Sequence, residues 1–181
     1  MKKIIYIILL VGVTVSAQGK YLTRVGFVQF KASIASFEKV EAINNSASAI
    51  LNIENGEIAV LVLIKAFRFK NALMEEHFNE SYAESDQYPK AIFKGKIQDF
   101  YIEKIDVNKN MFNLDGELSF HGKAKTLEGL SVTIKQNGDI ISVSGEFIAD
   151  ASDFNIKIPK IVRNKISKDI KVSFEFKLQK R

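Results

Sequence analysis

The amino-acid sequence predicts an all-β fold, an antiparallel barrel of about eight strands with one short helix inserted between two of them. Three observations support this prediction. Apolar and polar residues alternate along most of the chain, turn-forming residues separate the alternating runs, and one stretch follows a helical period instead. Many strands with one polar face fit either a sandwich or a closed barrel. Sequential hairpins favour the closed up-and-down barrel, because closure leaves no strand edge unpaired.

The N-terminus has the pattern of an export signal rather than of a strand. Two lysines precede an apolar run from Ile4 to Val15, and small residues follow up to Ala17. A run of about 12 residues is too short to span a bilayer, which needs about 20. We therefore expect a signal peptide over residues 1–17, cut between Ala17 and Gln18. Residues 18–181 are expected to form one domain, located in the periplasm or secreted.

Eight segments of the chain have the alternation that is typical of strands. Turn signals separate several of them, at Asn55-Gly56, at Asn108-Lys109-Asn110 and at Asn137-Gly138. The predicted strands cover residues 21–31, 47–54, 57–69, 91–103, 111–121, 130–136, 140–148 and 170–178. With no cysteine in the chain, this barrel would be stabilised by packing and not by disulfides.

The stretch MEEHFNESYAESDQYPKAIF, which starts at Met74, predicts the inserted helix. Asn71 is a suitable N-cap, and Met74, Phe78 and Tyr82 recur at a spacing of four residues. We interpret this helix as a lid whose apolar side closes space inside the barrel. Its carboxylates are expected to face water, and they are Glu75, Glu76, Glu80, Glu84 and Asp86.

The same stretch also has residue types that occur in metal and acid–base sites. His77 lies within it, and His121 is the only other histidine of the chain. A divalent metal needs more ligands at defined spacing, and no second histidine follows His77 on the helix. No serine lies in a G-x-S-x-G turn. We therefore expect no catalytic residue, no metal and no other cofactor, and we keep a two-histidine enzyme site as the weakest hypothesis.

Three glycines interrupt the apolar parity of the predicted strands. Gly95, Gly116 and Gly145 each lie between two large apolar residues of the same parity. Glycine at such positions permits the bends and close packing of a small barrel. Three missing side chains would equally leave space for a slender ligand. The sequence leaves both interpretations open.

A basic stretch follows the last turn signals of the chain. Most such runs are solvated surface, but one that borders the mouth of a barrel would attract an anionic bilayer or the acidic helix. Its side chains are Lys157, Lys160, Arg163, Lys165, Lys168 and Lys171. The net charge of +5 falls by two to +3 without Lys2 and Lys3, which is too weakly basic to indicate a nucleic-acid partner.

Three longer stretches together resemble the YceI-like family of exported lipid- and polyisoprenoid-binding proteins. They are MEEHFNESYAESDQYPKAIFKGKI, GELSFHGKAKTLEGLSVTI and ASDFNIKIPKIVRNKISKDIKV, and the resemblance extends from about Tyr21 to the end of the chain. It implies a lipocalin-like eight-stranded barrel around an apolar tunnel that holds an isoprenoid or another amphiphilic chain. Two positions depart from the family pattern: the first strand lacks a histidine, and Lys123 replaces a threonine after His121-Gly122.

These observations lead to a functional hypothesis. We expect an exported binding protein that sequesters or transports a polyisoprenoid or other long-chain amphiphile, such as a fatty acid. Transient contact with a membrane surface and a homodimer are further hypotheses on partners. The alternative is a filled barrel without ligand, which acts through its outer surface as a stress-response or interaction protein. The expected ligand-binding residues are Phe67, Phe69, Phe78, Phe93, Ile97, Phe112, Leu114, Gly116, Leu118, Phe120, Val143, Phe147 and Phe174.

Overall fold

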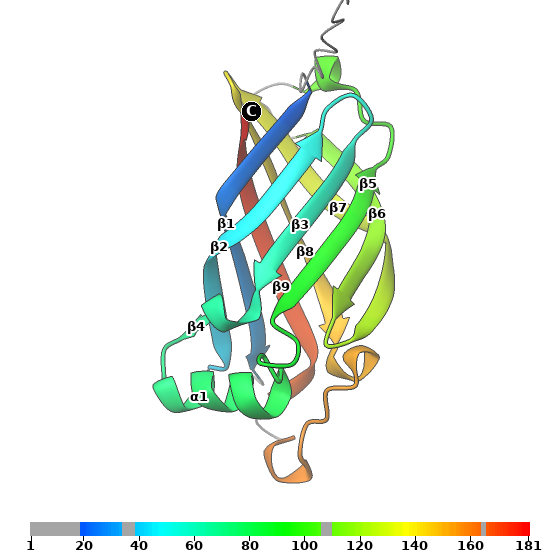
Figure 1. Cartoon of the computed structure of the whole chain (residues 1–181). Helices are drawn as coiled ribbons and strands as arrows, with labels where there is room; N and C mark the ends of the chain where they lie inside the picture. The colour runs from blue at the N-terminus through cyan, green and yellow to red at the C-terminus, as the bar shows by residue number, and fades with distance from the viewer. Residues whose placement is uncertain (1–18, 34–38, 106–109, 164–165) are drawn as a thin grey trace, which may run out of the picture.

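The computed structural model describes residues 19–33, 39–105, 110–163 and 166–181. Eight strands form a closed antiparallel barrel (Figure 1). They follow the order β1-β9-β8-β7-β6-β5-β3-β2 in space, and the pairing of β1 with β2 closes the ring. The strands are β1 Lys20–Ser33, β2 Glu41–Asn52, β3 Glu57–Leu63, β5 Lys90–Ile97, β6 Asn110–Phe120, β7 Lys123–Asn137, β8 Ile140–Asp150 and β9 Ile166–Lys180. The predicted eight-stranded antiparallel barrel is therefore confirmed.

Short elements connect or flank these strands. A two-residue strand, β4 (Arg68–Phe69), pairs with β2. The helical elements are η1 Ile64–Ala66, α1 Ala72–His77, η2 Phe78–Tyr82, η3 Ile102–Lys104, η4 Ala151–Phe154 and η5 Lys160–Val162. None of the helices in the described part of the chain has the length and hydropathy that crossing a bilayer requires. The expected signal peptide lies outside the described residues, as do Asn108 and Lys109 of one expected turn.

The predicted turns at two hairpins have the expected glycine conformation. Gly56 between β2 and β3 has a φ of +74°, and Gly138 between β7 and β8 has a φ of +57°. Glycine adopts this left-handed conformation without the steric cost of a side chain. Alternation along β3 follows the prediction as well, because Ile58, Val60 and Val62 are buried inside the barrel.

Several strand bounds differ from those predicted, and each difference has a local cause. The expected strand 57–69 is interrupted by η1, where the amide of Ile64 donates to the carbonyl of Pro89 at 2.9 Å. The expected strand 91–103 ends at Ile97, shortly before Asp99 with its φ of +51°. β7 starts at Lys123 and not at residue 130 as predicted. Its pairing with β6 shifts register near Gly129, and because the alternation changes phase there, the sequence pattern did not reveal the first half of the strand.

β2 also starts earlier than predicted, because a buried amide breaks its apolar pattern. Asn44 is fully buried, and its Nδ2 donates to the carbonyl of Leu63 at 2.9 Å while its Oδ1 accepts from the amide of Ser46 at 2.8 Å. These bonds satisfy the polar group inside the protein. Because this inward position is polar, the alternation in the sequence did not reveal the first half of β2.

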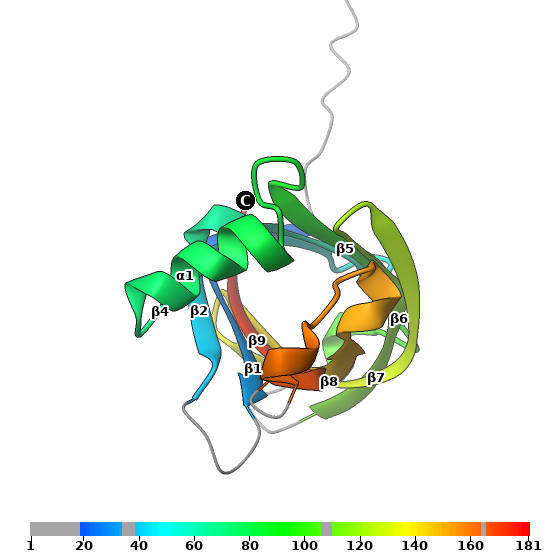
Figure 2. The ribbon, with the colours of Figure 1, turned by 90° about the horizontal axis from the view of Figure 1, so that it is seen from below.

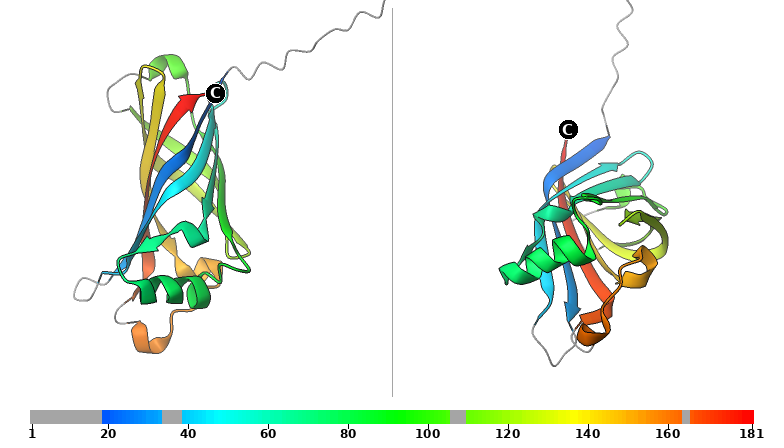
Figure 3. Two further views of the ribbon diagram at one scale, coloured as in Figure 1. Left: turned by 60° about the vertical axis from the view of Figure 1, so that its left-hand side comes forward. Right: turned by 60° about the horizontal axis from the view of Figure 1, so that its bottom comes forward.

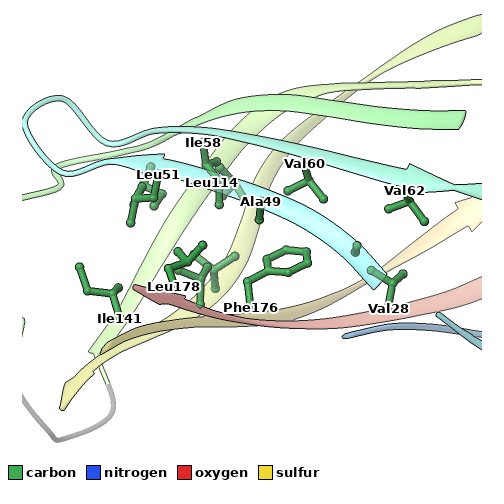
Figure 4. Close-up of a cluster of buried hydrophobic side chains, with 14 of the residues drawn as sticks. Val28, Ala49, Leu51, Ile58, Val60, Val62, Leu114, Ile141, Phe176 and Leu178 are labelled. Atoms are coloured by element: carbon green, nitrogen blue, oxygen red, sulfur yellow. The ribbon is translucent and has the colours of Figure 1, made fainter. Parts of the chain in front are cut away.

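The two ends of the barrel differ in how they are filled. The end that holds the β2–β3 and β7–β8 turns, here called the closed end, is packed with side chains that are less than 2% exposed. Leu51, Ile141 and Leu178 point into the barrel there (Figure 4). At the other end, here called the mouth, α1 lies along one side of the opening (Figure 2). Figure 3 shows the turn η5 beyond the rim at the same end.

Candidate ligand-binding cavity

A cavity of about 600 Å³ extends into the barrel from the mouth. This volume falls within the range of about 300–1,000 Å³ that is typical of small-molecule sites. All strands except β2 contribute side chains to its wall, and α1 and η2 contribute to its cover. The polar side chains on the wall are Asn71, His77, Tyr82 and Asp150, which all belong to elements at the mouth.

The structure brings most of the predicted site residues together on this wall. Eight of them lie in six helical or strand elements, and Phe67 lies between η1 and β4. The predicted residues that line the cavity are Phe67, Phe69, Phe78, Phe93, Leu114, Leu118, Phe120, Phe147 and Phe174. Their common position on one wall is thus a property of the fold.

Four predicted site residues lie away from the cavity wall. Ile97 and Val143 are 1% and 0% exposed and pack in the closed end. Phe112 lies near the start of β6, with its ring 6.2 Å from that of Phe100. Gly116 pairs with Gly95 and is covered by a ring. Parity along a strand correctly indicated an inward direction, but it does not indicate the depth along the barrel axis.

The glycines are covered by aromatic rings and do not leave empty space. A Cβ atom on Gly116 would lie 2.5 Å from both the carbonyl oxygen of Lys94 and Cζ of Phe93. The same Phe93 ring would lie 2.7 Å from a Cβ on Gly95. Gly145 pairs with Phe174, whose Cζ would lie 2.8 Å from an added Cβ. The structure therefore supports close packing: glycines make room for rings of the cavity wall, an arrangement that stabilises glycine in sheets.

The helix over the mouth begins as predicted and then widens. The Oδ1 of Asn71 accepts from the amide of Leu73 at 2.9 Å, which caps α1. After His77 the helix continues as η2, a π-helical turn. An α-helix has 3.6 residues per turn, so side chains four residues apart are rotated relative to one another around the helix axis. The wider π-helical turn offsets this rotation, so that Met74, Phe78 and Tyr82 lie more nearly in line. Met74, Phe78 and Tyr82 all line the cavity, as the lid interpretation requires.

A cluster of four rings attaches this lid to the barrel. The ring of Phe78 lies 5.3 Å from that of Phe30, 5.9 Å from that of Phe67 and 5.2 Å from that of Phe69, measured between centroids. Pairs at these separations contribute beyond the area that they bury. The lid is therefore held over the cavity mainly by apolar contacts that also form the cavity wall.

The carboxylates of the lid face water as predicted, with the exception of Glu75, which is half-buried against the rim. Glu76 and Glu80 are exposed. Glu75, in contrast, accepts from Nη1 of Arg68 at 3.0 Å and from the amide of Phe69 at 3.1 Å. Asp86 pairs with Lys65. These contacts hold the lid to the rim at β4 and η1.

His121 connects three elements at the opposite side of the rim. Its Nδ1 lies 2.8 Å from the carbonyl oxygen of Phe154, and its Nε2 lies 2.9 Å from Oε2 of Glu84. A carbonyl oxygen can only accept, so Nδ1 carries the proton in that bond. The ring also lies 4.4 Å from the ring of Tyr88. His121 therefore joins the β6–β7 turn to η4 and to the chain that follows the lid.

The two histidines do not form a metal site in the described residues. These residues contain no group of three or more histidine, cysteine, aspartate or glutamate side chains that could hold a metal ion. His77 is exposed beside the cavity mouth, whereas both ring nitrogens of His121 already have partners.

Asp150 is the one carboxylate on the cavity wall within the described residues. It caps η4, and its Oδ1 accepts from the hydroxyl of Ser152 at 2.6 Å and from the amide of Ser152 at 2.8 Å. These two hydrogen bonds, with a smaller contribution from Lys168, lower the pKa of the Asp150 carboxyl. η4 is further joined to β7 by an ion pair of 3.0 Å between Lys125 and Asp153.

Sequence reasoning missed some residues of the wall. Phe30 has the same parity as Val28 in β1, so its inward direction was visible in the alternation. Phe154 lies in η4, outside any alternating run, and its ring lies 5.6 Å from that of Phe120. No sequence pattern could have placed Phe154 on the wall.

Comparison with known proteins agrees with this architecture. The YceI-like domain family matches residues 20–178 of the chain. No curated protein matches it. A polyisoprenoid binding domain from Saccharophagus degradans, implicated in plant cell wall breakdown, is 13% identical with a TM-score of 0.78, over 90% of this chain and 99% of that domain.

Two further solved structures have the same fold. BcnA from Burkholderia cenocepacia is 19% identical with a TM-score of 0.69, over 83% of this chain and 94% of that protein. The YceI protein of Campylobacter jejuni is 17% identical with a TM-score of 0.65, over 82% of this chain and 89% of that protein. The family match covers nearly all of the barrel, and the chain belongs to the YceI-like family.

Proposed function

We propose that the barrel binds the apolar chain of a lipid, either a polyisoprenoid or another long-chain amphiphile such as a fatty acid. The observation that carries this proposal is the cavity of about 600 Å³, whose wall is apolar except at the mouth. The polyisoprenoid binding domain with the same fold supports it as well. The aromatic and aliphatic residues of the wall, including those predicted from sequence, are the proposed contacts of the chain.

The proposed mechanism is partition of an apolar chain between water or membrane and the cavity. Transfer of each methylene from water contributes about 0.8 kcal/mol before the costs of ordering the chain. The polar end of the ligand would stay at the rim beside Asn71, His77 and Asp150, because burial without partners is costly for a polar group. Such a protein sequesters or transports its ligand and needs no bond-making step, so we propose a binding role and not an enzymatic one.

The test uses protein from which bound lipid has been removed. We expect farnesyl and geranylgeranyl alcohols or palmitate to add their mass in native mass spectrometry and to raise the melting temperature. Native protein before extraction should also release a mass of this size. If no chain in the panel binds or stabilises the protein, the proposal falls and the alternative of an outer-surface function gains support.

A lid variant links the binding to this cavity. Phe78→Ala removes the ring that contacts Phe30, Phe67 and Phe69, so the affinity for a prenyl probe should fall about tenfold, which corresponds to about 1.4 kcal/mol. Glu76→Ala on the same lid is the control, because Glu76 is exposed and does not line the cavity. Equal affinities of the two variants would place the ligand elsewhere.

We also propose that the protein is exported to the periplasm or secreted. Support comes from the leader pattern of residues 1–17, and from the family that the chain belongs to. Mass spectrometry of protein from the native cell envelope and medium tests this point. A mature chain that starts at Gln18 is expected, and an intact Met1 in the cytoplasmic fraction would contradict it.

A further inference from the structure

The segment after η4 carries an exposed apolar residue at the mouth of the barrel. It forms the turn η5 beyond the rim (Figures 1 and 3). Ile158 and Val162 of this segment line the cavity, whereas Ile161 is 85% exposed. Among the large hydrophobic residues in the described ranges, Ile161 is the most exposed. The same turn therefore helps to cover the cavity and presents an isoleucine to the surroundings.

Cations without carboxylate partners surround this isoleucine. Lys157, Lys160 and Arg163 are exposed, and none of them forms an ion pair with a carboxylate in the parts of the chain that the structure describes. Nε of Arg163 donates to the carbonyl of Ile158 at 3.1 Å, which stabilises the turn. By contrast, Lys65 and Lys125 elsewhere on the rim pair with aspartates. Lys157, Lys160 and Arg163 thus place three positive charges around Ile161.

The opposite side of the opening has the opposite charge. α1 and η2 lie across the opening from the segment that holds η5 (Figure 2). Their exposed face carries Glu76 and Glu80. A negatively charged surface would attract the segment and repel the lid. The molecule would approach such a surface tilted, with the η5 side in contact and the lid turned away from it.

We propose that Lys157, Lys160, Ile161 and Arg163, here called the mouth patch, dock the protein on an anionic lipid bilayer. An apolar side chain flanked by cations is the chemistry that binds proteins to the bilayer interface. A single exposed isoleucine is common on protein surfaces. Here Ile161 is combined with three cations that have no carboxylate partner among the described residues, at the opening of an apolar cavity.

Docking goes beyond the proposed ligand binding, because it states where the ligand enters. A long apolar chain is sparingly soluble in water, since exposure of each methylene is unfavourable. A cavity that opens toward a bilayer receives the chain without transit through water. The two proposals make separate predictions, so either can fail alone.

Vesicle sedimentation tests the docking. Lipid-free protein is mixed with vesicles of pure phosphatidylcholine, or of phosphatidylcholine with about one third phosphatidylglycerol. We expect binding to the anionic vesicles only, with at least a fivefold drop between low salt and physiological salt, because salt screens charges on exposed side chains. Equal binding to both vesicle types, or none at all, would overturn the proposal.

Matched variants locate the contact. Ile161→Glu and the triple variant Lys157→Gln/Lys160→Gln/Arg163→Gln should each reduce anionic-vesicle binding at least fivefold. Val25→Glu and Met111→Glu are the apolar controls, because these residues are 79% and 66% exposed away from the mouth. Lys20→Gln/Lys135→Gln/Lys180→Gln removes the same charge from exposed positions at the closed end. If the controls lose as much binding as the mouth-patch variants, the patch is not the docking surface.

Two further measurements keep the outcomes apart. Melting temperatures confirm that each variant is folded, and affinity for a soluble prenyl probe is measured on the same samples. Probe binding without vesicle binding overturns docking and leaves the ligand proposal intact. Vesicle binding without probe binding overturns the ligand proposal and leaves docking intact. A dimer that Ile161→Glu converts to a monomer, with no vesicle binding, would assign the patch to a second copy of the chain.

Discussion

The ring of Phe93 covers two paired glycines in neighbouring strands, and this arrangement predicts the effect of a substitution. In Gly116→Leu the new side chain would meet both the ring and the carbonyl oxygen of Lys94, and the backbone cannot move away without breaking the β5–β6 pairing. We expect the free energy of unfolding of lipid-free protein to fall by about 1–3 kcal/mol or more, the usual cost of overpacking.

Chemical denaturation measures this change, with Thr126→Leu as control. Thr126 is exposed on β7 and pairs with Glu117 next to Gly116, so it accepts bulk without backbone contact. An unchanged or higher stability of Gly116→Leu would show that empty space lies over the glycine after all.

The two histidines should respond differently to removal. His121→Ala deletes the bonds to Phe154 and Glu84 from a side chain that is only 9% exposed, so we expect a loss of about 1–3 kcal/mol in the free energy of unfolding. Hydrogen exchange of residues 78–84 should rise in that variant, because the chain after the lid loses its tie to the rim. His77→Ala is the control, with an expected effect on the free energy of unfolding within about 0.5 kcal/mol, because His77 is exposed. One transition metal per chain that is lost from either variant would contradict the interpretation that neither histidine binds a metal.

Among the elements, η4 gives the barrel a local dependence on pH. The pKa of Asp150 is lowered in the folded protein by the hydrogen bonds from Ser152. The folded state therefore gains stability from this carboxylate at pH values above about 3.9, the ordinary pKa, and loses it as the pH falls through the lower folded pKa. Asp150→Ala should cost about 1 kcal/mol at neutral pH, as loss of a helix cap does, and the difference from the unmodified protein should shrink below pH of about 4.

Urea denaturation between pH 3 and 8 checks this prediction. Asp139→Ala is the matched control, because Asp139 is an exposed carboxylate in the β7–β8 turn. A stability difference for Asp150→Ala that stays constant over the whole pH range would contradict the role of the charged cap.

The prediction of elements from sequence succeeded where local chemistry decides and failed where tertiary contacts do. The turns at Gly56 and Gly138 and the cap at Asn71 depend on neighbours within a few residues, so the sequence contains the whole signal. The early start of β2 depends on a bond from Asn44 to Leu63, nineteen residues away. Such a partner is invisible in a pattern of alternation.

Depth along the barrel is the property that the sequence could not supply for the candidate site. Val143 and Phe147 lie on β8 with the same parity, four residues apart. Val143 is fully buried in the closed end, whereas Phe147 lines the cavity. Alternation is identical for both, and only the assembled ring of strands decides which level is filled.

For the whole molecule, the contrast between a packed closed end and a hollow mouth predicts that stability and ligand binding depend on different residues. Leu178→Ala in the closed end should cost about 2–5 kcal/mol, because the fully buried side chain leaves a cavity. The affinity of the folded variant for a prenyl probe should stay unchanged. Phe147→Ala on the cavity wall should cost roughly 1–2 kcal/mol, because its ring already faces open space, and should weaken probe binding about tenfold. Denaturation and fluorescence titration of both variants measure this, and equal losses of affinity would contradict it.

The packed closed end also has a consequence for how such a barrel changes over generations. Fully buried residues such as Leu51 and Ile134 hold the strands together at a distance from the opening. Substitutions at the mouth therefore act on a scaffold whose folding is secured elsewhere, and mutations that would otherwise unfold a small protein are tolerated there. Selection can change which apolar molecule fits the cavity by altering a few rim and wall positions, while the rest of the gene drifts only within the limits of close packing.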